Sequence, residues 1–168
     1  MTHAKDNFIA WLKSAHAMEE QSIAMLTAQT RRLENYPDLK ARMLDHLEET
    51  RVHAADLQEL LNHLSGAPSA LKDIAGRIAA TVHGIPGILV SDEVVKSTAD
   101  AYAFEHFEIA TYRTLLTAAD ELGEDEASAM LERILGEEVA MANWLEENLD
   151  PIARIFLMRD ERDLQAKR

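Results

Sequence analysis

The sequence contains no cysteine and few aromatic residues, and both shortages narrow the structures it can form. Without cysteine there are no disulfides, no thiolate metal ligands and no cysteine nucleophile. Phe, Trp and Tyr make up 5% of the 168 residues, although hydrophobic residues together make up 47%. Ala, Leu, Glu and Met are abundant, and these side chains lose little rotamer freedom in a helix. The composition therefore favours a single all-α domain, residues 1–168, with a substantial core.

Positive charge is also scarce. Lys and Arg number 17 against 30 Asp and Glu, which gives a formal net charge of -13. Such a surface repels phosphate backbones and anionic lipids, so we expect neither nucleic acid nor a membrane surface as a partner. The first residues, Met1 to Asp6, lack the apolar run of a secretion signal, and no apolar stretch is long enough to span a bilayer. We therefore expect a cytoplasmic protein.

Glycine and proline are few, and their positions divide the chain into helical segments. The long helices are predicted from near Asp6 to Tyr36, from about Pro37 to Leu64, from after Ser91 to Leu122, and from about Glu126 to Leu149. Short helices are predicted at Leu71–Val82 and, after Pro151, at Ile152–Met158. Two hairpins with short turns, joined by a long connection, are typical of an antiparallel four-helix bundle whose crossover runs the length of the bundle.

Each long helix has an apolar stripe that a glutamate interrupts near its middle. The interrupting residues are Glu19, Glu49, Glu108 and Glu138. Glu19 and Glu49 are equidistant from the first turn, and Glu108 and Glu138 are equidistant from Gly123, the second turn. Residues equidistant from the turn of an antiparallel hairpin meet at the same height, here about 22 Å from each turn at ~1.5 Å per residue. The sequence thus predicts four facing carboxylates in the interior.

Buried carboxylates need protons, cations or metal ions, because desolvating each charge costs several kcal/mol. The same stripes contain no Lys or Arg near these positions, but they contain His46 and a further acid, Glu105. Carboxylates with one or two imidazoles suit iron or manganese, with zinc as an alternative, and glutamates can bridge two ions about 3.5–4 Å apart. We therefore predict two divalent metal ions, iron first, with these ligands: Glu19, His46, Glu49, Glu105, Glu108 and Glu138.

Other interpretations stay open for several residues. His46 could orient a glutamate instead of binding metal. His16 and His53 are weaker candidates, because a lone histidine on an apolar face is usually a core residue. Tyr112 could lie near the metals, although a packed core tyrosine is the more usual role. Solvated positions are expected for three acids, Glu20, Glu48 and Glu137.

Short segments spread over the whole chain carry a resemblance to a known family. One group comprises Ala15-His16-Ala17-Met18-Glu19, His46-Leu47-Glu48-Glu49-Thr50, Phe104-Glu105-His106-Phe107-Glu108-Ile109-Ala110 and Glu137-Glu138. A second group comprises Tyr36-Pro37-Asp38-Leu39, Ser91-Asp92-Glu93-Val94-Val95-Lys96 and Met141-Ala142-Asn143-Trp144-Leu145. The first group resembles the YciE/YciF family of ferritin-like proteins, and the second resembles its YciE branch in particular. The resemblance implies a rubrerythrin-like bundle, a homodimer, a link to bacterial stress responses and no settled reaction.

The sequence departs from the parent di-iron pattern, in which two helices each supply a Glu and two supply Glu-x-x-His. Val52 stands three residues after Glu49, and Met141 stands three residues after Glu138. His46 instead precedes its glutamate, and the fourth helix has no histidine. At most one half of the site is therefore expected to have a nitrogen ligand.

Two functions from different classes fit these features. The first is a ferritin-like metalloprotein that, if it turns over, oxidises Fe(II) or reduces peroxide. A chain without cysteine has no rubredoxin module, so electrons would come from a separate donor. The alternative is a non-catalytic, stress-induced structural or interaction bundle with little or no metal. A hollow iron-storage cage is less favoured, because the resemblance implies dimers.

Overall fold

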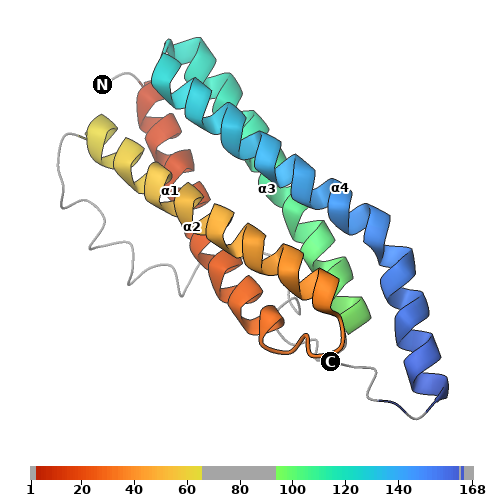
Figure 1. The fold of residues 1–168 in the computed structure, drawn as a ribbon. Helices are drawn as coiled ribbons and strands as arrows, with labels where there is room; N and C mark the ends of the chain where they lie inside the picture. The colour runs from red at the N-terminus through yellow and green to blue at the C-terminus, as the bar shows by residue number, and fades with distance from the viewer. Residues whose placement is uncertain (1–2, 66–93, 163, 165–168) are drawn as a thin grey trace.

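The computed structural model describes residues 3–65, 94–162 and 164, and this part of the chain forms four long helices (Figure 1). They are α1 (His3–Thr30), α2 (Pro37–Ser65), α3 (Val94–Leu122) and α4 (Asp125–Glu161). α1 packs mainly on α2, and α3 packs mainly on α4. The predicted all-α antiparallel four-helix bundle is confirmed. The short helix predicted at Leu71–Val82 lies outside the described residues.

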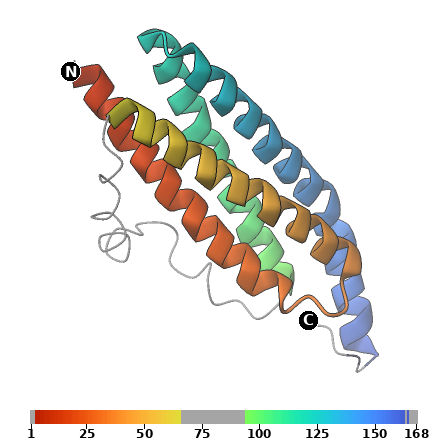
Figure 2. The ribbon, with the colours of Figure 1, turned by 60° about the vertical axis from the view of Figure 1, so that its left-hand side comes forward.

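The turns of the two hairpins lie at opposite ends of the bundle (Figure 2). The Lys5 Nζ atom is 2.8 Å from Glu124 Oε1, so α1 begins beside the turn between α3 and α4. At the other end, Gln29 Nε2 donates a hydrogen bond of 3.2 Å to the Ser97 carbonyl, so α1 ends where α3 begins. α1 and α3 therefore run antiparallel along their whole lengths, and their centres lie at one level.

Gly123 makes the tight turn between α3 and α4. Its φ is +67°, in the left-handed region that only glycine enters at low cost. The Gly123 N–H donates to the Asp120 carbonyl (3.1 Å), and the Glu124 N–H donates to the Ala119 carbonyl (3.0 Å). This pair of bonds is a Schellman motif, which satisfies carbonyls left over at the end of a helix. The sequence-based assignment of this turn is confirmed.

The C-terminal end of the bundle differs from the prediction. A separate short helix after Pro151 is wrong, because α4 runs without interruption to Glu161 and contains Pro151. Proline removes one backbone hydrogen bond from a helix interior, which ordinarily bends or ends the helix. Here Ile152 is buried in the core and Phe156 packs against the same cluster, so side-chain burial holds the helix together beyond the proline. The extended α4 projects past the other helices (Figure 1).

The hydrophobic core is divided into two clusters. One contains Phe8, Leu12, Leu61 and Leu131, among others, near the α3–α4 turn. The other lies at the opposite end of the bundle and includes Leu33, Leu39, Val94 and Leu145. A polar layer lies between these clusters. Within the described segments, no helix has both the length and the apolar composition needed to cross a membrane.

Replacing Gly123 by alanine should destabilise the protein by about 1–2 kcal/mol, because a Cβ atom makes the left-handed backbone unfavourable. Gly136 is the matched control: it lies inside α4, and neither glycine has a heavy atom within 4 Å of an added Cβ. Gly136→Ala should stabilise by up to ~1 kcal/mol through helix propensity. Urea unfolding followed by circular dichroism measures both, and equal stability of the two variants would contradict the role of the turn.

Candidate metal centre

Six glutamate and histidine side chains with no exposed surface form the polar layer in the middle of the bundle. Every helix contributes: Glu19 from α1, His46 and His53 from α2, Glu105 and Glu108 from α3, and Glu138 from α4. Each has a relative exposure of 0%. Five of the six predicted ligands are thus brought together, and His53 joins them. Helical periodicity explains the result, because these residues share the faces that bear the core leucines.

The six side chains form two groups that share Glu138. The first group is His46, Glu105, Glu108 and Glu138, and the second is Glu19, His53 and Glu138; the candidate ligand atoms of each group lie within 4.8 Å of one another. His46 Nε2 is 3.4 Å from Glu138 Oε2, and His53 Nδ1 is 2.9 Å from Glu138 Oε1. Each oxygen of Glu138 therefore faces a different histidine.

Each histidine also lies near a second buried carboxylate. His46 Nε2 lies 3.3 Å from Glu105 Oε2, and His53 Nδ1 lies 3.7 Å from Glu19 Oε2. The two imidazoles therefore approach the carboxylates from different positions along α2.

Most of the inward-facing ligand atoms make no well-aligned hydrogen bond in the described structure, although each histidine nitrogen among them lies 2.9–3.7 Å from two carboxylate oxygens. The atoms without such a bond are both carboxylate oxygens of Glu105, Glu108 and Glu138, together with Glu19 Oε2, His46 Nε2 and His53 Nδ1. Buried polar atoms in folded proteins are nearly always paired, and leaving one unpaired costs about 1–3 kcal/mol. So many converging carboxylate oxygens and imidazole nitrogens fit a bound cation, and their chemistry is that of an oxygen-rich metal site with imidazole.

The histidines are the only cationic partners of these buried carboxylates within the described residues. Burial by itself lowers the pKa of each imidazole. The carboxylates of Glu105, Glu49 and Glu138 outweigh this effect and raise the pKa of His46 to about 10. Contacts with Glu138 and Glu19 likewise raise the pKa of His53 to about 10. In the metal-free protein both rings are therefore imidazolium ions at neutral pH.

Three of the buried glutamates have pKa values shifted upward. Burial raises the pKa of Glu108 well above its usual value, and the charges of Glu138 and Glu105 add to the effect. Burial is also the main cause of the raised pKa values of Glu19 and Glu138, which the neighbouring His53 partly offsets. Without metal, the site therefore retains protons that a bound cation would displace.

Glu49 departs from its predicted position. Its side chain is 35% exposed, so the expectation that it sits in the buried centre is wrong, and it belongs to neither group. Its Oε2 atom lies 2.8 Å from His46 Nδ1 and 3.3 Å from Arg42 Nη1. The hydrogen bond with His46 is the main cause of its lowered pKa. Glu49 sits one turn beyond His46, at the edge of the buried face, where its side chain reaches solvent and Arg42.

His53 and Glu137 lie closer to the buried layer than the sequence suggested. His53 lies seven residues after His46 on α2, and this two-turn spacing was the available signal. Glu137 is half-buried, not fully solvated as predicted, and its Oε2 atom lies 2.5 Å from His53 Nε2. This contact joins α4 to α2, so no spacing along a single helix could reveal it.

The other residues considered from the sequence lie around the centre. Tyr112 is fully buried and donates a hydrogen bond to Glu19 Oε1, so it contacts a candidate ligand directly. His16 is only half-buried and belongs to neither group. Glu20 and Glu48 are exposed, as expected.

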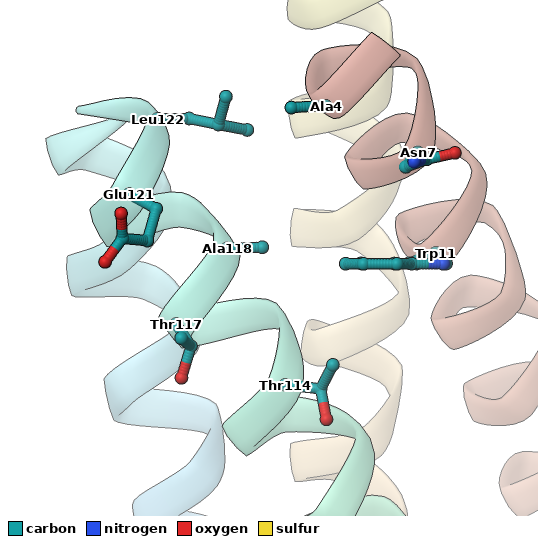
Figure 3. Close-up of a pocket in the computed structure, with 8 residues that line it drawn as sticks. All are labelled: Ala4, Asn7, Trp11, Thr114, Thr117, Ala118, Glu121 and Leu122. Atoms are coloured by element: carbon teal, nitrogen blue, oxygen red, sulfur yellow. The ribbon is translucent and has the colours of Figure 1, made fainter.

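A separate open groove of about 670 Å³ lies on the surface between α1 and α3 (Figure 3). It is lined by Ala4, Asn7, Trp11, Thr114, Thr117, Ala118, Glu121 and Leu122. Its lining includes one carboxylate and no histidine, so it offers no converging set of metal ligands. Among the described residues, the groups that could hold a metal ion lie in the buried layer.

Residues 3–158 match a family described as a domain of unknown function, DUF892. The chain is 30% identical over 151 residues to protein YciF of Escherichia coli strain K12, which covers 83% of this chain and 86% of that protein. The crystal structure of the E. coli stress protein YciF has a TM-score of 0.67 at 26% identity, covering 89% of this chain and 96% of that one. The predicted family resemblance is confirmed, and placement in the YciE branch stays a prediction.

Two further solved structures share the fold. A protein from Xanthomonas campestris pv. campestris has a TM-score of 0.78 at 36% identity, covering 95% of this chain and 99% of the other. A Bacillus anthracis protein described as ferritin-like and diiron-carboxylate has a TM-score of 0.73 at 21% identity, covering 89% and 99%. The present chain therefore has a ferritin-like four-helix fold.

The metal-free protein should lose stability as pH rises. When folding raises the pKa of a group, the protonated group stabilises the folded state at pH values below the unfolded-state pKa. That stabilisation is lost as the pH rises through the folded-state pKa. For His46 and His53 this window runs from 6.5 to about 10, and the raised glutamate pKa values act in the same direction. After chelator treatment, the urea midpoint should fall steadily between about pH 7 and 10.

Matched variants on α2 separate this effect from general alkaline destabilisation. His53→Gln should flatten the pH dependence, whereas replacing the exposed His63 by glutamine should leave it unchanged. A midpoint that stays constant or rises over this range in the wild-type protein would show that the buried histidines are not held as imidazolium ions.

Proposed function

Because this chain belongs to the DUF892 family and is similar to the stress protein YciF, we propose that it is a ferritin-like stress-response protein that binds two divalent metal ions inside its bundle. The observation that carries the proposal is the position of Glu138, with one oxygen toward His46 and the other toward His53. A carboxylate with an oxygen for each of two sites is the arrangement of a bridging ligand.

The proposed ligands divide into two subsites. His46, Glu105 and Glu108 would hold one ion, Glu19 and His53 would hold the other, and Glu138 would bridge them. Ligand atoms about 2.0–2.2 Å from a common ion lie about 3 Å from each other. The separations of 2.9–3.7 Å between histidine nitrogens and glutamate oxygens are of this size. Glu49 is left out of the direct ligands because it faces the other nitrogen of His46.

Charge balance also supports two ions. Four ionised carboxylates carry four negative charges, and two imidazolium ions neutralise only half of them. Two divalent ions would neutralise all four while the histidines bind as neutral imidazoles. A donor set of carboxylates with two imidazoles favours iron, with manganese or zinc as alternatives.

An iron pair would supply one-electron chemistry, so Fe(II) oxidation or peroxide reduction is the reaction class to test. The surrounding residues would orient the ions and exclude bulk water, because every proposed ligand is fully buried. Repeated turnover would need a separate electron donor, since the chain has no cysteine for a redox module.

Wild-type protein loaded anaerobically with Fe(II) or Mn(II) should retain about two ions per chain after desalting, measured by elemental analysis. Glu138→Ala should retain fewer than one, because both subsites lose a ligand. The matched control is Glu20→Ala on α1, whose side chain is exposed and should not affect uptake. Circular dichroism checks that each variant remains helical.

If the wild type retains no more metal than a Glu19→Ala/Glu138→Ala double variant, the metal proposal fails. The chain would then be the alternative, a structural or interaction bundle that keeps the fold without using metal.

We also propose a cytoplasmic homodimer as the working form. Sedimentation should then give twice the chain mass of 18.8 kDa. A species at the monomer mass would contradict the dimer, and a shell of many subunits would point to iron storage.

A further inference from the structure

Each buried histidine uses both of its ring nitrogens. His46 turns Nε2 toward the buried carboxylates and Nδ1 toward Glu49, at 2.8 Å from its Oε2 atom. His53 has the opposite arrangement: Nδ1 faces the buried carboxylates, and Nε2 lies 2.5 Å from Glu137 Oε2. Both glutamates reach the surface, with side-chain exposures of 35% and 32%. Each histidine thus has an inner nitrogen for the site and an outer nitrogen for a glutamate.

An arginine holds each of these outer glutamates. Arg42 Nη1 donates to Glu49 Oε2 at 3.3 Å. Arg133 Nη1 lies 3.1 Å from both oxygens of Glu137, and its Nη2 atom bonds to Asp56 on α2. Each histidine is therefore the buried end of a series of contacts, which runs from the ring through a glutamate to an arginine.

A simple surface ion pair does not account for this arrangement. Arg133 and Glu137 are four residues apart on α4, and exposed pairs of that kind contribute little stability. Such a pair does not require Glu137 to reach across to His53 on α2, which lies beside α4 (Figure 1). The contact with a fully buried imidazole is the feature that needs a separate explanation.

We infer that Glu49 and Glu137 are positioning residues that fix His46 and His53 in opposite tautomers; this inference rests on the proposed metal centre. A neutral imidazole has one N–H and one lone pair, and a carboxylate beside one nitrogen keeps the N–H there. Glu49 therefore accepts the Nδ1–H of His46 and leaves Nε2 to bind metal. Glu137 accepts the Nε2–H of His53 and leaves Nδ1 to bind metal.

The opposite tautomers follow from the placement of both histidines on α2. Seven residues separate them, which is about 10.5 Å along a helix axis. Glu138 lies between them and contacts both. Because both histidines extend from one helix and lie on either side of Glu138, their rings present different nitrogens to that carboxylate.

The test compares Glu49→Ala, Glu137→Ala and their glutamine counterparts with the wild type, using Zn²⁺ alone as the probe in calorimetry. Carboxylates that orient metal-binding histidines typically contribute 10–100-fold in metal affinity. Glu49→Ala should weaken one zinc site by about this factor and spare the other, and Glu137→Ala should do the reverse. The glutamine variants should lose less, because the amide oxygen still accepts the ring N–H.

Matched controls are Glu48→Ala on α2 and Glu132→Ala on α4, both exposed and next to or near the positions tested. Zinc affinity should not change in either. Long-range ¹H–¹⁵N spectra of zinc-loaded wild type should place the ring proton on Nδ1 of His46 and on Nε2 of His53. A purely structural role of the glutamates would not fix this pattern.

The inference is overturned if both alanine variants bind two zinc ions as tightly as the wild type, or if the spectra show the reverse tautomers. If wild type binds no zinc or other divalent ion, the proposed function itself fails. The metal-free spectra, in which both rings are imidazolium ions, then test the positioning role through the outer contacts: the Nδ1–H signal of His46 and the Nε2–H signal of His53 should be protected in wild type and lost in the matching alanine variant. Unchanged signals in those variants would refute it.

Discussion

The burial of four carboxylates in the middle of the bundle is the constraint on which the rest of the structure depends. Glu19, Glu105, Glu108 and Glu138 have no exposed surface, and each buried charge costs several kcal/mol unless it is compensated. Two histidines supply part of the compensation in the metal-free protein, and raised carboxyl pKa values supply more. The layer also divides the apolar core in two, so leucine packing at both ends holds together a centre that is unfavourable by itself.

The helix lengths place this layer at one height although the two turns lie at opposite ends. α1, α2 and α3 have 28, 29 and 29 residues, and the polar residues lie near the midpoint of each. A midpoint is equally far from both ends, so the hairpins can pack in opposite senses without separating the carboxylates.

The buried histidines show how this chain differs from the parent di-iron pattern. That pattern takes a Glu-x-x-His from each of two helices, whereas α2 here supplies both buried histidines and α4 supplies none. The absence of the motif suggested a site poor in nitrogen, but the described structure has two imidazoles, one on each side of Glu138. Glu49 and Glu137 contact these imidazoles and also contact Arg42 and Arg133, so the network of contacts around the buried layer reaches partly exposed side chains.

The sequence by itself determined the approximate spans of the four long helices as far as Pro151, the turn at Gly123 and the burial of Glu19, Glu105, Glu108, Glu138 and His46. These features follow from local rules: the period of a helix, the positive φ of glycine, and the register of an antiparallel hairpin. Only the tertiary structure decided the positions and contacts of Glu49, Glu137 and His53. Glu49 and Glu137 lie at stripe edges, where a small rotation of the helix moves a side chain between core and solvent. The position of Glu137 depends on its contact with His53 on the neighbouring helix α2. The continuation of α4 through Pro151 depends on the packing of Ile152 and Phe156 against the core.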